Sequence, residues 1–220
     1  MKAICLSLLI GLASLGARAE DTPLPDSVAG IAHRWATIYY RMPEKDRENA
    51  YKTLAEQAAQ TAQANPQQAE PMVWEAIVLA SYAKEQGGLG ALGKVKQARE
   101  LLLNAEKINP RALNGSIYTS LGSLYAKVPG WPVGFGDKDK ARDYLETALR
   151  MNPGSIDAHY FYGDLLASQG EYARALEQLR LALAAPPRPG REDADNGRRQ
   201  EIQTLIAQIH SRHGNQPEEQ

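Results

Sequence analysis

Cysteine is nearly missing from this sequence of 220 residues, in which Cys5 is the only one. Cys5 lies in an apolar N-terminal stretch with the features of a cleavable signal, so the mature chain is expected to have no thiol. Without thiols the chain can form no disulfide, no cysteine nucleophile and no thiolate metal site. Its stability must therefore come from the packing of side chains, and a chain of this length can bury a sufficient core.

The apolar stretch near the N-terminus is too short for a transmembrane helix, which needs about 20 residues. It covers residues 3–15, follows Met1-Lys2 and precedes Ala17-Arg18-Ala19. A basic start, a short apolar core and an A-x-A site are typical of a secretory signal peptide. We therefore predict a signal peptide at residues 1–19, cleaved after Ala19, and a polar leader at residues 20–26. The mature protein is expected to be periplasmic or secreted, without membrane insertion.

An excess of positive charge is missing as well. The formal net charge is −1, and it becomes −3 once Lys2 and Arg18 leave with the signal peptide. Neither nucleic acid nor an anionic membrane surface is therefore expected as a partner. Strict alternation of apolar and polar residues, which indicates half-buried strands, is not found either, so an all-α fold is expected.

A repeated helical pattern is the main feature that the sequence does contain. Its clearest copy, at residues 115–153, has these positions: Tyr118, Leu121, Gly122, Tyr125, Ala141, Leu145, Ala148 and Pro153. The order follows the tetratricopeptide motif, W-x2-L-G-x2-Y … A-x3-F … P, with conservative replacements at the aromatic positions. The segment resembles a tetratricopeptide repeat (TPR), but VPGWPVGFGD is inserted where a repeat has a tight turn.

Two further copies flank this one. The copy at residues 70–110 lies 43 residues earlier, so that Asn109-Pro110 aligns with Asn152-Pro153, and it also has an insert, EQGGLGALG. The copy at residues 156–187 follows at the usual spacing of 34 residues and has a tight turn in place of the insert. So many matches in one register indicate a true internal repeat.

Weaker elements complete the chain at both ends. Residues 27–66 have the apolar spacing of a helical hairpin with a degenerate TPR signature. Residues 188–198, charged and rich in Pro and Gly, are predicted to be a loop, and residues 199–213 a helix that caps the open end of the stack, as solenoids require. The expected fold is an all-α, right-handed TPR-like solenoid of about four antiparallel helix pairs plus a C-terminal capping helix.

The inserts at residues 84–98 and 127–141 are either structural or recognition loops. In the second, Trp131 and Phe135 are held among prolines and glycines. Both rings either fold back to fill the gap between helices, with Asp137 capping the next helix, or line a pocket or partner surface. The first insert contains G-x-G-x-x-G, but a helix precedes it and no βαβ unit exists, so nucleotide binding is not expected.

TPR superhelices bind partners on the concave face, which the first helix of each pair lines. The resemblance therefore implies partner-binding positions at Lys84, Thr119, Ser123, Lys127, Tyr160 and Asp164. Some TPR proteins grip the C-terminal carboxylate of chaperones with two lysines and two asparagines. That set is not reproduced, since Ala76, Thr119 and Tyr160 occupy one of its lysine positions. A chaperone tail is therefore not the expected partner.

Residues with catalytic chemistry do not cluster in the sequence. The four histidines are scattered, and His210 and His213 share a helix face without a third ligand nearby. Neither the nucleophile motif G-x-S-x-G nor the zinc motif H-E-x-x-H occurs. Enzymatic activity, a metal site and a cofactor are therefore not expected.

The resemblance implies a non-enzymatic, exported scaffold or adaptor that binds a protein or peptide. An alternative comes from a tyrosine, a proline and then GD-x-x-K-A before the second helix, which resemble the periplasmic T component of TRAP transporters, itself a TPR protein. That resemblance implies a transporter-associated subunit that holds a small apolar ligand and docks on a substrate-binding protein. It predicts a continuous apolar cavity that reaches Trp131 and Phe135.

Overall fold

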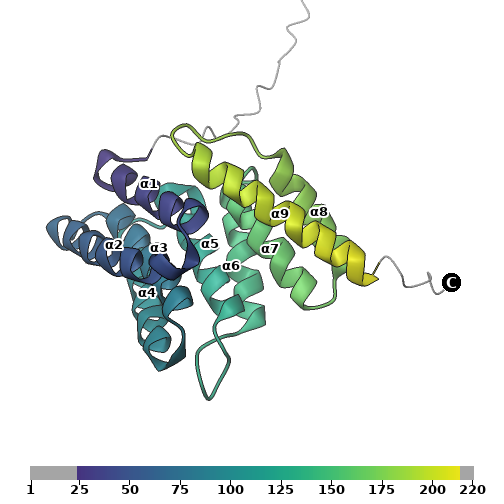
Figure 1. The fold of residues 1–220 in the computed structure, drawn as a ribbon, viewed down its shortest axis with the longest axis horizontal. Helices are drawn as coiled ribbons and strands as arrows, with labels where there is room; N and C mark the ends of the chain where they lie inside the picture. The colour runs from purple at the N-terminus through teal and green to yellow at the C-terminus, as the bar shows by residue number, and fades with distance from the viewer. Residues whose placement is uncertain (1–23, 214–220) are drawn as a thin grey trace, which may run out of the picture.

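The fold is a stack of antiparallel helix pairs (Figure 1). The computed structural model describes residues 24–213; the predicted signal peptide and most of the leader lie outside this range. The helices are α1 (Asp26–Arg41), α2 (Glu44–Ala64), α3 (Ala69–Gln86), α4 (Gly88–Ile108), the short 3₁₀ helix η1 (Ala112–Gly115), α5 (Ser116–Lys127), α6 (Lys138–Met151), α7 (Ile156–Ser168), α8 (Tyr172–Ala184) and α9 (Glu192–His213).

The predicted all-α solenoid, with four TPR-like helix pairs and a terminal helix, is confirmed. Among residues 24–213 the β-type pairing that occurs is one isolated bridge between Gly130 and Gly136. No helix in the same range is both long and apolar enough to cross a membrane.

Asn-Pro dipeptides end the second helix of the first three pairs. Asn65, Asn109 and Asn152 are the C-terminal caps of α2, α4 and α6. The proline after each of them cannot continue a helix, because it has no N–H and its ring clashes with the preceding turn. The side-chain oxygens of Asn109 and Asn152 accept the backbone N–H groups of Arg111, at 3.0 Å, and Gly154, at 3.2 Å. These hydrogen bonds stabilise the turns into the next pair.

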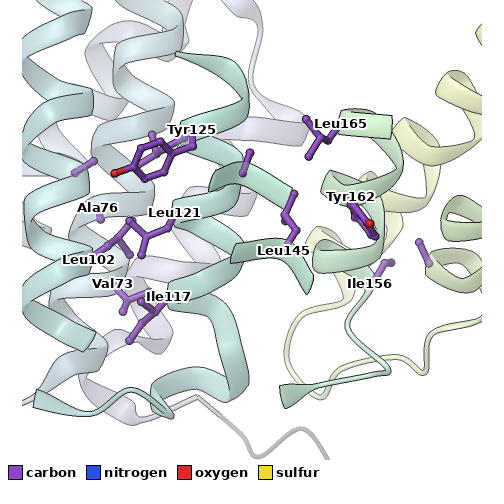
Figure 2. Close-up of a cluster of buried hydrophobic side chains, with 14 of the residues drawn as sticks. Val73, Ala76, Leu102, Ile117, Leu121, Tyr125, Leu145, Ile156, Tyr162 and Leu165 are labelled. Atoms are coloured by element: carbon purple, nitrogen blue, oxygen red, sulfur yellow. The ribbon is translucent and has the colours of Figure 1, made fainter. Parts of the chain in front are cut away.

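The core lies where the helices of each pair meet (Figure 2). Leu121 on α5 and Leu145 on α6 are fully buried there. Gly122 allows the close approach of these helices, since a Cβ at this position would lie 2.5 Å from Cγ of Leu145. Gly163 has the same relation to Leu179 in the next pair, where the distance would be 2.9 Å. The glycine of the TPR motif therefore sets the separation within a pair.

The last helix, α9, packs against both ends of the stack. Ala194, near its start, belongs to the core cluster of the first pairs together with Val28 and Trp35. Ile202 and Ile209, further along, belong to the cluster of the later pairs. In Figure 1 α9 crosses the stack from α1 to α8, and it contacts both helices. The solenoid is therefore closed on itself instead of ending as an open array.

The prediction of a loop over residues 188–198 was wrong from Glu192 onward, because α9 begins there. The first turns of α9 pack through small and charged side chains. A Cβ at Gly197 would lie 2.2 Å from an aromatic ring on α1, and Asp195 and Arg198 are buried in ion pairs. A helix of this kind lacks the apolar periodicity by which sequence patterns reveal helices.

The two aligned inserts fold differently. Gly87-Gly88, both with a φ of 62°, make a sharp turn after α3, and the rest of the glycine-rich stretch forms the first turns of α4. The insert predicted at residues 84–98 is therefore mostly helical. Residues 128–137, in contrast, form a loop between α5 and α6. The two prolines of this loop have no N–H to donate to a helix, which accounts for the difference.

Candidate partner-binding groove

A groove of about 730 Å³ runs along the concave face of the stack. Its lining comes from the first helices of the pairs, from the start of α4, and from α9 with the segment before it. The predicted positions that line it are Lys84, Thr119, Ser123, Lys127 and Tyr160. Asp164 lies beside it, in a smaller hollow that Tyr160 shares. The structure thus brings five of the six predicted concave positions together around one space.

An aromatic wall borders the groove on the side of α1 and α3. Trp35 stacks on Tyr39, with ring centroids 5.1 Å apart, and meets Trp74 edge-on at 6.2 Å. The indole N–H of Trp35 donates to the hydroxyl of Ser81 at 2.8 Å, which fixes the ring. Lys84 lies 4.7 Å from the centroid of the Tyr39 ring and donates to its hydroxyl at 3.0 Å. Because Trp35 and Trp74 are almost fully buried, the half-buried ring of Tyr39 and the positive charge of Lys84 held on it supply most of the exposed surface of this wall.

Small hydroxyl side chains of α5 form the floor of the groove: Ser116, Thr119, Ser120 and Ser123. Two of them are tied to the preceding turn, Ser116 to the carbonyl of Leu113 at 2.7 Å and Thr119 to that of Gly115 at 3.2 Å. Lys127 at the end of the same helix pairs with Asp164 of α7. Because these side chains are short, the space between α3 and α7 stays open.

The wall formed by α7, α9 and the segment before α9 is held by charges. Asp157 on α7 accepts from Nη1 of Arg188 and from Nε of Arg198, both at 2.8 Å. Arg198 is only 5 % exposed and also donates to Glu201 at 2.7 Å. Its guanidinium covers the ring of Tyr160, at 4.5 Å from the centroid. These contacts join α7 to α9 and to the segment before it.

Burial alone would raise the pKa of the Asp157 carboxyl, because it disfavours the charged form. The positive charges of Arg188, Arg198 and Arg191 outweigh burial and hold the pKa of Asp157 well below its usual range. Burial likewise opposes the charge on Arg198, but neighbouring acidic groups, Asp157 first, keep its pKa well above the usual value. The buried charges are therefore retained at neutral pH and compensate each other.

Phe135 closes a gap between repeats. Its ring meets Tyr125 edge-on with centroids 5.3 Å apart, and the guanidinium of Arg99 on α4 lies 4.3 Å from its centroid. Asp137 caps α6 as predicted, since its side chain accepts the backbone N–H groups of Asp139 and Lys140, both at 3.1 Å. Phe135 therefore follows the packing interpretation of the insert.

Trp131 does not follow that interpretation, because its side chain is 90 % exposed. Neither Trp131 nor Phe135 lines the groove, which ends at Val128 and Pro129. The cavity predicted from the transporter-like resemblance, which was to reach both rings, is therefore not the one observed. A loop can hold one aromatic inward and present the other outward, and composition alone does not distinguish them.

Replacement of the two rings is expected to have unequal effects on stability. Phe135→Ala should lower the free energy of unfolding by about 1–2 kcal/mol, because it removes packing against Tyr125 and Arg99. Trp131→Ala should change it by less than about 0.5 kcal/mol, since the ring makes little contact with the protein. Urea denaturation followed by circular dichroism measures both. Equal losses in the two variants would contradict the assignment.

The sequence patterns missed several residues of the groove. The aromatic wall on α1 lies in the hairpin whose TPR signature is degenerate, although Trp35 and Tyr39 stand one helical turn apart, which is a usable signal. Arg188 and Arg198 fell within the predicted loop, and no local pattern marks them. His159, one of the scattered histidines, is buried, and its two ring nitrogens lie 2.8 Å from Gln178 Oε1 and 2.9 Å from the carbonyl of Pro153.

Metal-binding geometry is not found in the described part of the chain. Among residues 24–213 no group of three His, Cys, Asp or Glu side chains is placed to hold a metal ion. The side chain of His213, one of the two helix-face histidines, lies outside what the structure describes.

Comparison with known proteins identifies the type of repeat. Residues 133–189 match a family model described as tetratricopeptide repeat. A comparison with curated proteins gives no match. Among solved structures, TTC0263, a thermophilic TPR protein of Thermus thermophilus, has 18 % identity and a TM-score of 0.43, with 82 % of this chain and 98 % of that chain covered.

Two further solved structures are similar to a comparable degree. MamA has 18 % identity and a TM-score of 0.41, with 77 % of this chain and 93 % of that chain covered. The pilF protein of Pseudomonas aeruginosa has 14 % identity and a TM-score of 0.36, with 87 % and 94 % covered. The family match covers residues 133–189, and the helix pairs before it repeat the same motif positions, so the repeats of this chain are of the tetratricopeptide type. Such repeats form extended concave surfaces for protein–protein interaction and are generally not catalytic.

Proposed function

We propose that this protein is an exported, non-catalytic scaffold that binds an extended segment of a partner protein in its groove. The observation that carries this proposal is the groove itself, about 730 Å³ in volume, with an aromatic wall, a hydroxyl floor and lysines at its edge. The half-buried rings of Tyr39 and Tyr160 offer aromatic surface for contact with a partner. Hydroxyl groups both donate and accept hydrogen bonds, which suits a peptide backbone.

Export is supported by the basic start, apolar stretch and A-x-A site of residues 1–19. These residues lie outside the described range, so the support comes from the sequence alone. N-terminal sequencing of the protein recovered from the periplasmic fraction would test it. A mature chain that starts at Glu20 agrees with the proposal, and an intact Met1 in the cytoplasm contradicts it.

A bulky residue on the groove floor is expected to abolish partner binding. Ser123→Trp fills space between α3 and α7 from a half-buried position that is not part of the core. We expect capture of a partner from periplasmic extract to fall at least tenfold, the loss of about 1.4 kcal/mol or more. Thr53→Trp, at an exposed position of α2 that does not line the groove, is the matched control. Equal capture by both variants would show that the groove is not the binding site.

A second candidate function follows from the volume of the groove and from α9, which forms part of its wall. Pockets of about 300–1,000 Å³ are typical of small-molecule sites, and the groove volume of about 730 Å³ lies in that range. In this alternative the groove holds a small, partly apolar ligand. The protein is then a transporter-associated subunit that docks on a substrate-binding protein. Native mass spectrometry of the purified protein distinguishes the two candidates, because only the second predicts a co-purifying small molecule that Ser123→Trp removes.

A further inference from the structure

Exposed apolar side chains concentrate on the two aligned inserts. Among residues 24–213, the large apolar side chains with the highest exposure are Trp131 at 90 %, Leu89 at 89 % and Val133 at 58 %. All three lie in two segments without any charged residue, 86–93 and 128–136. We call these two segments the insert edge. Exposed apolar side chains that gather in one place, unlike scattered ones, mark an interaction site.

The two segments are neighbours in space. Ala91 and Leu92 at the start of α4 line the same groove as Val128 and Pro129. The cation–π contact between Arg99 of α4 and Phe135 joins the two repeats directly below the loop tip. In Figure 1 the loop between α5 and α6 extends beyond the ends of the helices. The insert edge therefore consists of two apolar segments from adjacent repeats.

The loop of the insert edge is held in one shape by its own backbone. Val133 and Gly134 donate their N–H groups to the carbonyl of Gly130, at 3.2 and 3.1 Å, and Gly136 donates to that of Pro129 at 2.9 Å. At Gly136 a Cβ would lie 1.8 Å from a backbone oxygen, so only glycine fits where the loop closes. The backbone of the exposed tip should therefore lose little conformational entropy on binding.

Lysines lie next to the insert edge in the sequence. Apart from Lys84 and Lys127, which belong to the groove, residues 86–96 and 128–140 contain four lysines and two acidic residues, in a chain with a net charge of −1. One of those acids, Asp137, caps α6. Lys138 and Lys140, just after the loop, are exposed. The region around the insert edge is therefore basic, although the net charge of the whole chain is slightly negative.

We propose that the insert edge binds the surface of an anionic lipid bilayer. Trp131, Val133 and Leu89 enter the interfacial region, and the surrounding lysines contact the lipid head groups. Tryptophan is enriched at membrane interfaces because its ring is apolar with one polar group. Each lysine close to an anionic surface adds attraction that salt screens. This binding is separate from partner binding in the groove.

The chemistry of the tip favours lipid over a protein pocket. Protein interfaces carry about one hydrogen bond per 100–200 Å², but the exposed tip has no polar side chain except the indole of Trp131. Its prolines lack an N–H, and several other backbone donors are already paired within the loop. Paired donors are what an apolar medium requires, because unpaired ones are costly there. Two separate tips also fit a deformable surface more easily than two matching pockets.

Vesicle binding tests the proposal. The purified full chain is sedimented with vesicles of phosphatidylcholine alone or of phosphatidylcholine with phosphatidylglycerol, at low and high salt. We expect binding to the anionic vesicles at low salt, with loss at high salt, and a blue shift of tryptophan emission. The shift reports Trp131, because Trp35 and Trp74 are only 7 % and 2 % exposed. Absence of binding to anionic vesicles at low salt overturns the proposal.

Variants separate lipid binding from general stickiness. Trp131→Ala and, separately, Lys138→Glu with Lys140→Glu should each weaken anionic-vesicle binding by about tenfold or more. Leu181→Ala, which removes another exposed apolar side chain, and Lys107→Glu with Arg111→Glu, near the opposite end of α4, should bind as the unmodified chain does. If Trp131→Ala loses a protein partner but binds vesicles unchanged, the insert edge is a protein-docking site and the proposal is wrong.

Discussion

Arg198→Ala is expected to lower the free energy of unfolding by about 3–5 kcal/mol, the range observed when one partner of a buried ion pair is removed. Arg198 is 5 % exposed and neutralises Asp157 and Glu201 at hydrogen-bond distances of 2.8 and 2.7 Å. Its loss leaves Asp157 with a weaker set of positive charges and removes cover from the ring of Tyr160. Urea denaturation measures the change, and Arg180→Ala at an exposed position of α8 is the matched control.

The pH dependence of stability tests whether charge, and not only packing, causes this loss. The pKa of Asp157 is held below its usual range in the folded protein. The unfolded chain therefore binds more protons in acid, and the contribution of Asp157 is complete above about pH 4 and is lost as the pH falls below that value. In Arg198→Ala the pKa of Asp157 should be less depressed. The free energy of unfolding should therefore fall less steeply as the pH is lowered below about 4. Parallel curves for the two proteins would show that packing alone accounts for the loss.

Gly122→Ala is expected to destabilise the protein by about 2–3 kcal/mol, although alanine is a better helix former than glycine. The new Cβ would lie 2.5 Å from Cγ of Leu145 and 3.1 Å from the backbone oxygen of Ala141. Leu145 is fully buried and cannot move into solvent, so α5 and α6 must separate.

The same substitution at Gly93 provides a control of opposite sign. Gly93 lies within α4, and apart from its chain neighbours and the nearby backbone of its own helix no atom lies within 4 Å of an added Cβ. Gly93→Ala should therefore stabilise the protein by about 0.5–1 kcal/mol. Thermal unfolding of both variants measures the contrast. If Gly122→Ala also stabilised the protein, the close approach of α5 and α6 would not depend on glycine.

The repeats could be predicted from the sequence because their motif positions are core positions. The small and large residues of the second helices have no exposed surface in any of the three clear copies: Ala98, Leu102, Ala141, Leu145, Ala175 and Leu179. Packing of this kind repeats with the helical period, so a single sequence displays it. The concave positions followed from the same register, which is why Lys84, Ser123 and Tyr160 were placed on one groove.

The closure of the groove could not be predicted, because it depends on contacts distant in the sequence. Asp157 meets Arg188 and Arg198, and Tyr39 and Tyr40 each donate to a carboxylate oxygen of Glu201 at 3.2 Å. These residues are charged or polar, so hydrophobic periodicity does not record them. The exposure of Trp131 could not be predicted either. Whether an aromatic side chain in a loop points inward or outward depends on the backbone conformation of the turn, which hydrophobic periodicity does not record.

The contact of α9 with α1 changes how the whole chain should unfold. In an open solenoid each repeat touches only its neighbours, so terminal repeats can fray and stabilities add along the array. Here Ala194 packs with the first helices, Ile202 packs with the later ones, and Arg41 of α1 pairs with Asp193 of α9. Neither end can detach without weakening the other. Cooperative unfolding in one transition is therefore expected, with slower folding than in an open array, because contacts between distant segments raise the contact order.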